Sequence, residues 1–240
     1  MVLQTSSKAI TPTVTWEALP ADFALPDDPV ENIQQPTLAA ALTDALGAAG
    51  RIQPTMLIGS NFGLVATVNK KIVVKAPDWF YVPQVHPVAE GIIRRSYTPN
   101  LEGEPVAIAM EFLVEEDNGE LSLRATPPYG KLYFYEQILQ VPTYVIYDPY
   151  EPSLEARCLQ NGRYAMQTPD TEGRIYIPEL DLRIGIWLGE RLGQTTHWLR
   201  WWDNAGNLLL WSAEQAQRER QRAEALAAKL RELGVDPDPL

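Results

Sequence analysis

Three residues in the middle of the chain have the types and the surroundings that metal-assisted hydrolysis requires. Asp78 follows a proline, Glu111 interrupts an apolar, strand-like run, and Lys131 opens an aromatic-rich segment with helical spacing. Two convergent carboxylates can hold a hard divalent cation, and a nearby ammonium group can orient or polarise a water beside it. These side chains are the minimal equipment for metal-assisted phosphodiester hydrolysis, provided that the fold brings them together.

The size and the composition of the chain predict a globular protein. It has 240 residues, of which 45% are hydrophobic and seven are Trp, enough for one sizeable core. It has no apolar run long enough to span a bilayer, and its N-terminus has no basic segment followed by an apolar stretch. We therefore expect a soluble, cytoplasmic protein.

Cysteine and histidine are too scarce for several common kinds of site. The sequence has one cysteine, Cys158, and two histidines, His86 and His197. A single cysteine excludes an internal disulfide framework and a cysteine-rich zinc site. Two histidines likewise exclude a multi-histidine metal centre.

The net charge of −11 opposes tight binding to nucleic acid, because phosphate contacts usually require a basic footprint. An acidic chain can still bind DNA through a local basic patch. Candidates for DNA contacts are Lys71, Lys75, Arg94 and Arg95. A solvated surface is the more common role of such clusters and explains the same residues without DNA.

Composition divides the chain into three parts. Residues 1–36 are rich in Pro, Thr and Asp and read as an N-terminal arm, residues 37–211 as the main domain, and residues 212–240 as a C-terminal helix and tail. Apolar residues at helical spacing after Pro36 predict a first helix that ends at Gly47 or Gly50.

After its first helix, the main domain contains many segments typical of short strands and one segment typical of a longer helix. Residues 130–139 have helical spacing, and a short helix is expected around 88–93. Asn69-Lys70 predicts a tight hairpin, and residues 197–202 with 208–211 predict another. Strands are expected at 56–58, 63–68, 72–75, 79–82, 106–114, 143–147, 154–159, 164–167, 175–177 and 182–187.

The order of these elements predicts a mixed sheet. A strand at 106–114, a helix at 130–139 and a strand at 143–147 form a crossover unit, which requires a parallel pair. The short turns after residue 150 predict an antiparallel extension. Tyr129, Tyr133 and Tyr135 can line a cleft, although aromatic residues at helical spacing more often belong to the core.

The tail from Ser212 onwards is rich in helix-forming residues, with Ser212 as the expected N-cap and Gln215 as its capping-box partner. Its apolar residues repeat every seven positions, which suits either a self-association helix or a terminal helix packed on its own domain. The repeat consists of Ala216, Ala223 and Leu230, with Leu226 and Leu233 in the alternate positions.

The segments around Asp78, Glu111 and Lys131 resemble the Uma-two family of restriction-endonuclease-like proteins, part of the PD-(D/E)XK nuclease superfamily. The resemblance continues through the Gln- and Arg-rich segment that starts at Gln217. It also covers Val141-Pro142-Thr143-Tyr144, Tyr147-Asp148-Pro149, the segment 173–180 and Arg200-Trp201-Trp202-Asp203.

The resemblance implies an α/β fold of the restriction-endonuclease type, with a mixed central sheet flanked by helices, an antiparallel extension and a C-terminal helix. It implies Mg²⁺, or Mn²⁺, held by Asp78, Glu111 and the backbone carbonyl of Phe112, with Lys131 positioning a water. It also implies DNA as the substrate, and a homodimer suits the cutting of two strands.

The chain departs from the superfamily pattern at two places. Leu113 occupies the position of the usual strand lysine, so Lys131 must supply the ammonium group from the following helix. Gln34-Gln35 stand where many members carry an acid on the first helix, and Glu31 is the nearest acid upstream. The alternative is therefore a catalytically weak or inactive nuclease-fold protein that acts as a binding, regulatory or dimeric interaction module.

Each candidate also has a purely structural interpretation. Asp78 can cap a turn after Pro77, Glu111 can pair with a lysine, and Lys131 can be an exposed residue at a helix start. Spacing alone does not separate these interpretations from a metal site.

Overall fold

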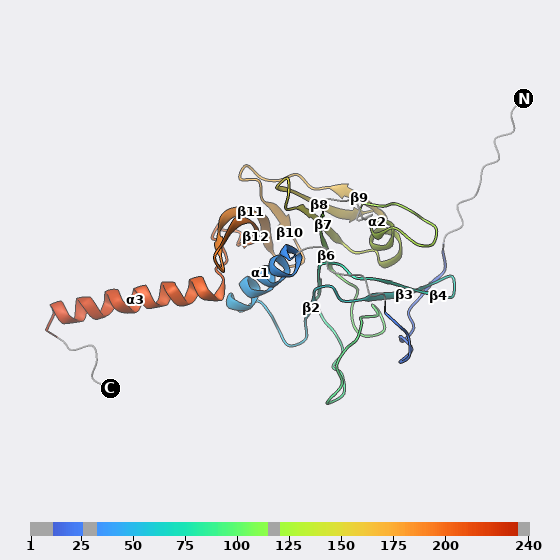
Figure 1. Cartoon of the computed structure of the whole chain (residues 1–240), viewed down its shortest axis with the longest axis horizontal. Helices are drawn as coiled ribbons and strands as arrows, with labels where there is room; N and C mark the ends of the chain where they lie inside the picture. The colour runs from blue at the N-terminus through green and yellow to red at the C-terminus, as the bar shows by residue number, and fades with distance from the viewer. Residues whose placement is uncertain (1–11, 26–32, 115–120, 235–240) are drawn as a thin grey trace, which may run out of the picture.

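A six-stranded mixed sheet forms the centre of the computed structural model, which describes residues 12–25, 33–114 and 121–234 (Figure 1). The two middle strands, β6 and β7, run parallel, and the other neighbouring pairs are antiparallel. This confirms the predicted mixed sheet. The strands are, in spatial order, β2 (Leu57–Gly59), β5 (Trp79–Val82), β6 (Ile108–Phe112), β7 (Thr143–Asp148), β8 (Ser153–Gln160) and β9 (Arg163–Met166).

The crossover between the parallel strands is one short helix that begins with α-helical and continues with π-helical hydrogen bonding. It starts as α2 (Lys131–Tyr133) and continues as the π-helix η1 (Phe134–Leu139). Gln140 follows in a left-handed conformation with φ 52°, and Pro142 prevents the helix from continuing. The crossover buries its apolar side chains against the sheet, which holds its first residue close to β6.

Two smaller sheets flank the central one. The first has the order β1-β3-β4, and Asn69 and Lys70, both at positive φ, form its predicted tight hairpin. The second has the order β10-β11-β12 and is separate from the central sheet. Their strands are β1 (Val14–Thr15), β3 (Leu64–Val68), β4 (Lys71–Lys75), β10 (Ile175–Ile177), β11 (Leu182–Arg191) and β12 (Gln194–Trp202).

One local prediction is confirmed only in part, and another was wrong. The hairpin predicted for 197–202 with 208–211 forms only next to its turn, where Trp202 bridges Leu208 and Leu209 N–H donates to the Trp201 carbonyl at 2.8 Å. β12 instead pairs along its whole length with β11, through a turn at Leu192-Gly193. Both turn residues have positive φ, a geometry that suits a two-residue hairpin loop. Residues 88–93 form no helix, since their apolar side chains have no buried surface to face: Ile92 and Ile93 are exposed.

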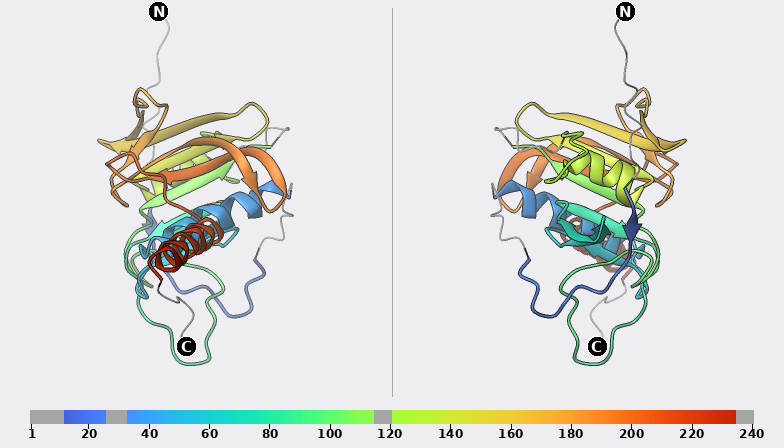
Figure 2. Two further views of the ribbon diagram at one scale, coloured as in Figure 1. Left: turned by 90° about the vertical axis from the view of Figure 1, so that its left-hand side faces the viewer. Right: turned by 90° about the vertical axis from the view of Figure 1, so that its right-hand side faces the viewer.

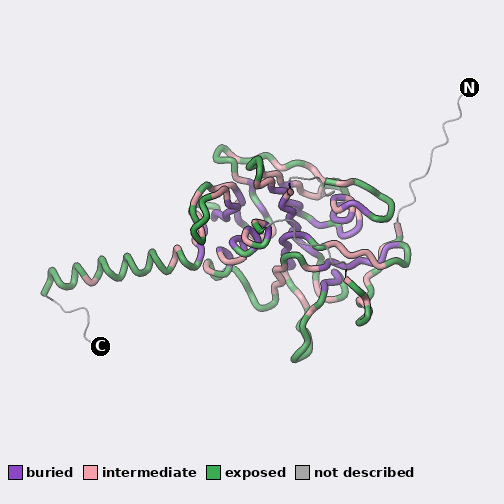
Figure 3. Tube along the Cα trace, viewed as in Figure 1, coloured by how far each residue is buried: buried purple, intermediate pink, exposed green. Residues whose placement is uncertain are grey.

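The helices and small sheets cover opposite faces of the central sheet (Figure 1). α1 (Gln34–Ala48) and β10–β12 lie over one face, while the α2–η1 crossover and the β3–β4 hairpin lie over the other (Figure 2, right). α1 starts at Gln34, three residues before the predicted position, because Pro36 is tolerated in the first turn of a helix. Both faces are buried in the centre of the domain (Figure 3).

The last helix, α3 (Ser212–Glu232), projects away from the domain and is seen nearly end-on in Figure 2, left. Its N-cap is Trp211, not the predicted Ser212, and the backbone N–H of Trp211 donates to Glu214 Oε2 at 2.8 Å. No residue of α3 is buried, and Figure 3 shows it exposed along its length. Within the described residues, no helix is long and apolar enough to cross a membrane.

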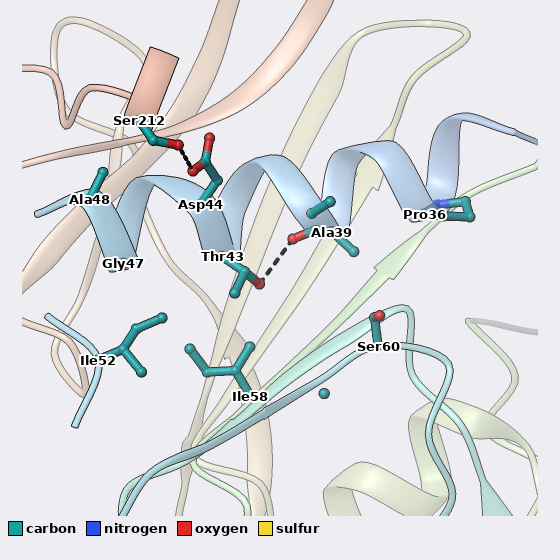
Figure 4. Close-up of a pocket in the computed structure, with 12 residues that line it drawn as sticks. Pro36, Ala39, Thr43, Asp44, Gly47, Ala48, Ile52, Ile58, Ser60 and Ser212 are labelled. Atoms are coloured by element: carbon teal, nitrogen blue, oxygen red, sulfur yellow. Dashed lines mark hydrogen bonds between the residues drawn. The ribbon is translucent and has the colours of Figure 1, made fainter. Parts of the chain in front are cut away.

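The first turn of α3 is attached firmly to α1. Trp211 Nε1 donates to the carbonyl of Ala41 at 3.0 Å, and Gln215 Nε2 donates to the carbonyl of Ala48 at 2.9 Å. Ser212 donates its hydroxyl hydrogen to Asp44 (Figure 4). These bonds fix the direction in which α3 leaves the domain.

A buried arginine completes this attachment. Arg200 on β12 is fully buried, lies over the Trp211 ring at 3.4 Å from its centroid, and pairs with Glu214 Oε2 at 2.6 Å. Burying a guanidinium group is costly unless a partner and hydrogen bonds compensate its charge. Glu214 is therefore the residue that makes the burial of Arg200 tolerable.

We predict that Glu214→Ala lowers the free energy of unfolding by about 3–5 kcal/mol, because it leaves a buried cation without its partner. Chemical denaturation of both proteins measures the difference. Glu224→Ala, an exposed acid on the same helix, serves as the control and is expected to change stability by less than about 0.5 kcal/mol. Equal effects of the two variants would contradict this role of Glu214.

Candidate active site

Asp78 and Glu111 are neighbours across the β5–β6 pair. The antiparallel register pairs Trp79 with Met110, and its continuation by one residue sets Asp78 opposite Glu111. The backbone N–H of Phe112 donates to Asp78 Oδ2 at 2.6 Å, which fixes this carboxylate against the end of β6. Side chains directly opposite each other in such a pair are close enough to interact.

Both carboxylates point to the same face of the sheet. Alternation along a strand places every second side chain on one face. Phe80 and Ala109 belong to the core under the α2–η1 crossover, whereas Trp79 and Met110 belong to the core under α1. Asp78 has the parity of Phe80, and Glu111 has the parity of Ala109, so both acids face the crossover.

Glu111 is fully buried and has a donor for each carboxylate oxygen. Tyr135 donates its hydroxyl hydrogen to Oε1 at 2.8 Å, and Lys131 Nζ donates to Oε2 at 3.1 Å. Burial raises the pKa of Glu111 to about 8, opposed by the positive charge of Lys131 and reinforced by the negative charge of Asp78. Burial therefore favours the neutral, protonated form of this carboxyl over the charged one.

Lys131 reaches this carboxylate because it is the first residue of α2, and a quarter of its side chain stays exposed. Tyr135 follows four residues later, so both side chains lie on the same side of the helical crossover. Burial and the adjacent Glu111 raise the pKa of the Tyr135 hydroxyl well above its usual value, so it remains a hydrogen-bond donor. Helical spacing indicated Tyr135 as core; its polar role follows from its contact with Glu111.

Gln35, near the start of α1, holds the third predicted ligand atom. Its Nε2 donates to the carbonyl oxygen of Phe112 at 3.0 Å, and both residues are buried. A carbonyl oxygen has two lone pairs, so this bond leaves one of them for another partner. The sequence signal for this contact was the amide pair at the start of the predicted first helix.

Two of the predicted DNA-contacting lysines line a hollow that the segment before the α2–η1 crossover also borders. Lys71 and Lys75 on β4 line a hollow of about 420 Å³ together with Pro128 and Tyr129. The ring of Tyr129 stacks on that of Tyr133, with centroids 5.9 Å apart and planes 13° apart. The hollow thus combines two cations with an aromatic wall, close in sequence to Asp78 and Lys131.

The two predicted arginines hold loops together. Arg94 pairs with Glu102 at 2.6 Å and also donates to the carbonyl of His86. Arg95 donates to the carbonyls of Ala21 and Phe23, at 2.6 Å and 2.9 Å. Their structural roles are clear from these contacts, and a role in binding DNA stays a prediction.

The oxygen atoms at the site suit a hard divalent cation. Asp78, Glu111 and the Phe112 carbonyl are the hard ligands that Mg²⁺ prefers, and this ion usually takes few protein ligands and keeps several waters. In the described parts of the chain, no group of three or more His, Cys, Asp or Glu residues is placed to hold a metal. Glu31, the upstream acid noted above, lies outside the described residues.

A separate hollow of about 700 Å³ lies between α1 and β2, near the start of α3 (Figure 4). Small and apolar residues line most of it, with Asp44 at one end. None of the predicted site residues borders it, so the candidate chemistry belongs to the other face of the central sheet.

A mixed sheet that presents an aspartate and a glutamate to a lysine on the next helix has the arrangement expected of a restriction-endonuclease-like protein. The model of the Uma2 family, described as "Putative restriction endonuclease", matches residues 26–191, and the chain belongs to this family. The match includes Asp78, Glu111 and Lys131 and ends before α3. A comparison with curated proteins finds no match.

We predict that stability without divalent cations depends on pH through Glu111. The carboxyl titrates near 4.5 when unfolded and near 8 when folded. The folded state therefore binds the proton more tightly. This contribution to stability is complete below about pH 4.5 and is lost as the pH rises through about 8.

Urea unfolding in EDTA at pH 5.5 and 8.5 tests this dependence. The stability of the wild type relative to Glu111→Gln is expected to fall between the two pH values, because the amide does not titrate. Glu224→Gln, which changes an exposed acid, controls for the general effect of removing one charge. A constant difference between the wild type and Glu111→Gln would contradict the raised pKa.

Proposed function

We propose that this protein is a Mg²⁺-dependent endonuclease that hydrolyses phosphodiester bonds in DNA. The observation that carries the proposal is the buried Glu111 carboxylate, set beside Asp78 and bonded to Lys131 at 3.1 Å. Family membership supports the same activity. A fully buried carboxyl is a costly way to gain stability even when it is paired, because the desolvation of a buried ion pair can exceed its mutual attraction.

Asp78, Glu111 and the carbonyl of Phe112 would hold the cation. Bound Mg²⁺ supplies a Lewis acid for the phosphate oxygen and lowers the pKa of a coordinated water. For binding, Glu111 must lose its proton, and the hydroxyl of Tyr135 then holds Oε1 in a fixed orientation. Gln35 keeps the Phe112 carbonyl at its place through the 3.0 Å bond.

Lys131 is the residue that changes partner in this scheme. In the structure its ammonium group donates to Glu111 Oε2, and a quarter of the side chain is exposed. Once other charge neutralises Glu111, the ammonium group is available to orient the attacking water or to stabilise negative charge on the phosphate. This role is the one that a lysine at position 113 would otherwise perform.

An acidic protein can bind DNA only where its surface carries local positive charge. Lys71 and Lys75 on β4 provide two cations in one hollow, where Tyr129, two residues before Lys131, offers an apolar wall. Affinity from so few cations is expected to be modest and to decrease strongly with salt. The protein is proposed to act as a homodimer, since two sites suit the cleavage of two strands.

Nicking of supercoiled plasmid in Mg²⁺ or Mn²⁺ tests the proposal. The wild type is expected to nick, and Asp78→Ala and Glu111→Ala are expected to lose roughly 100-fold or more of this activity, because each removes charge that stabilises the transition state. Glu224→Ala is the matched acid control. Equal nicking by all proteins, or none with either metal, would overturn the nuclease assignment and favour a binding module.

A second-site change tests whether Lys131 takes the place of the usual strand lysine. Leu113 has the same parity as Glu111, and its backbone N–H still bonds to Tyr147 at the end of β6. Lys131→Ala is expected to lose roughly 100-fold of the nicking rate. Adding Leu113→Lys to that variant is expected to restore part of it, because the new ammonium group projects toward the same face.

Two controls accompany this experiment. Leu113→Met in the Lys131→Ala background keeps the size of the side chain without the charge and is expected to restore nothing. Denaturation of each variant separates loss of folding from loss of activity. Full activity of Lys131→Ala alone would contradict the role given to this lysine.

A further inference from the structure

α3 leaves the domain as an extended arm, although part of its surface is apolar. Leu226, Leu230 and Leu233 are 55%, 39% and 77% exposed. Most helices in proteins gain their stability by packing an apolar face rather than from helix propensity. Because the first turn is bonded to α1 and Arg200, the rest of the helix cannot fold back on its own domain.

The apolar side chains of α3 form one seam with a seven-residue repeat. The residues in its N-terminal half are small or charged, and those in its C-terminal half are leucines. In order along the helix the seam is Ser212, Ala216, Glu219, Ala223, Leu226, Leu230 and Leu233.

We propose that α3 pairs with α3 of a second copy of this chain in an antiparallel two-helix coiled coil. With the copies reversed, each leucine of one helix meets a smaller residue or an aliphatic stem of the other. Leu226 faces Ala223, Leu230 faces Glu219, and Leu233 faces Ala216 of the second copy. Alternation of large and small residues across a seam allows the helices to interlock.

The opposite, parallel arrangement has a specific defect. It sets Glu219 of one copy directly against Glu219 of the other within the seam, and like charges in contact are unfavourable. It also places Ala216 opposite Ala216 and Ala223 opposite Ala223 of the second copy. The N-terminal half of the seam would then bury little apolar surface. In the antiparallel pair, Glu219 instead lies level with Lys229 of the second copy, an opposite charge.

The placement of the two domains also agrees with an antiparallel pair. α3 extends outward from one end of the domain (Figure 1), so reversed helices hold the domains at opposite ends of the pair. Domains on a parallel pair would meet at the same end. The inference specifies the interface of the proposed homodimer and does not depend on the nuclease chemistry.

Mass measurement on the full chain tests whether α3 is the interface. Light scattering after size exclusion is expected to give twice the monomer mass of 26.9 kDa for the wild type at high concentration. Leu226→Asp with Leu230→Asp is expected to give the monomer mass. Ala228→Asp, on the opposite side of the same helix, is the matched control and is expected to remain dimeric. A monomeric wild type, or a dimeric double variant, would overturn the proposal.

Disulfide trapping tests the orientation in a Cys158→Ser background, which removes the one native cysteine. Chains with Ala216→Cys, mixed with chains carrying Leu233→Cys, are expected to cross-link with each other. Each variant alone is expected not to, because antiparallel pairing separates identical positions by about 25 Å along the helix. Cross-linking of each variant with itself, and not of the mixture, would show the parallel pair and overturn the proposal.

These readouts require no catalysis. A failure of the plasmid assay therefore leaves the masses and cross-links unchanged, and a failure of the pairing leaves the effect of Asp78→Ala on nicking unchanged.

Discussion

The removal of the Glu111 carboxylate from water is the constraint on which the candidate site depends. A fully buried carboxyl requires donors, and the structure supplies one for each oxygen, Tyr135 and Lys131. Asp78, set opposite by the strand register, adds negative charge and thereby contributes to the raised pKa of Glu111. The same features that make the carboxyl costly without a cation make it suited to hold one, since a bound divalent ion compensates both acids.

A second buried charge organises the other end of the molecule. Arg200 lies among tryptophans, and Glu214 compensates it from the first turn of α3. The two charged sites lie on opposite faces of the central sheet, as their neighbouring cores show. The candidate catalytic site and the base of α3 therefore lie in different parts of the fold, and α1 contacts both, through Gln35 at one end and Asp44 near the other.

Much of the fold was predictable because its elements have strong local patterns. The run of apolar residues around Glu111 predicted a central strand, and Pro142 with the helical spacing before it predicted the crossover and its parallel pair. The wrong predictions concern segments where two conformations or two strand pairings compete, and the residue pattern of one segment does not decide between them. The polar turn at 204–207 forms, but residues 208–211 do not extend into a strand, because the edge of β12 already pairs along its length with β11.

The sequence by itself determined the candidate acids, the strands that carry them and the absence of a lysine at Leu113, since residue type and strand periodicity are local properties. Only the tertiary structure decided that Lys131 meets Glu111 across 20 residues, and that Gln35 meets the Phe112 carbonyl across 77. Such contacts depend on how the crossover and α1 pack on the sheet. That packing is set by the volumes of many buried side chains together, a property that no single segment encodes.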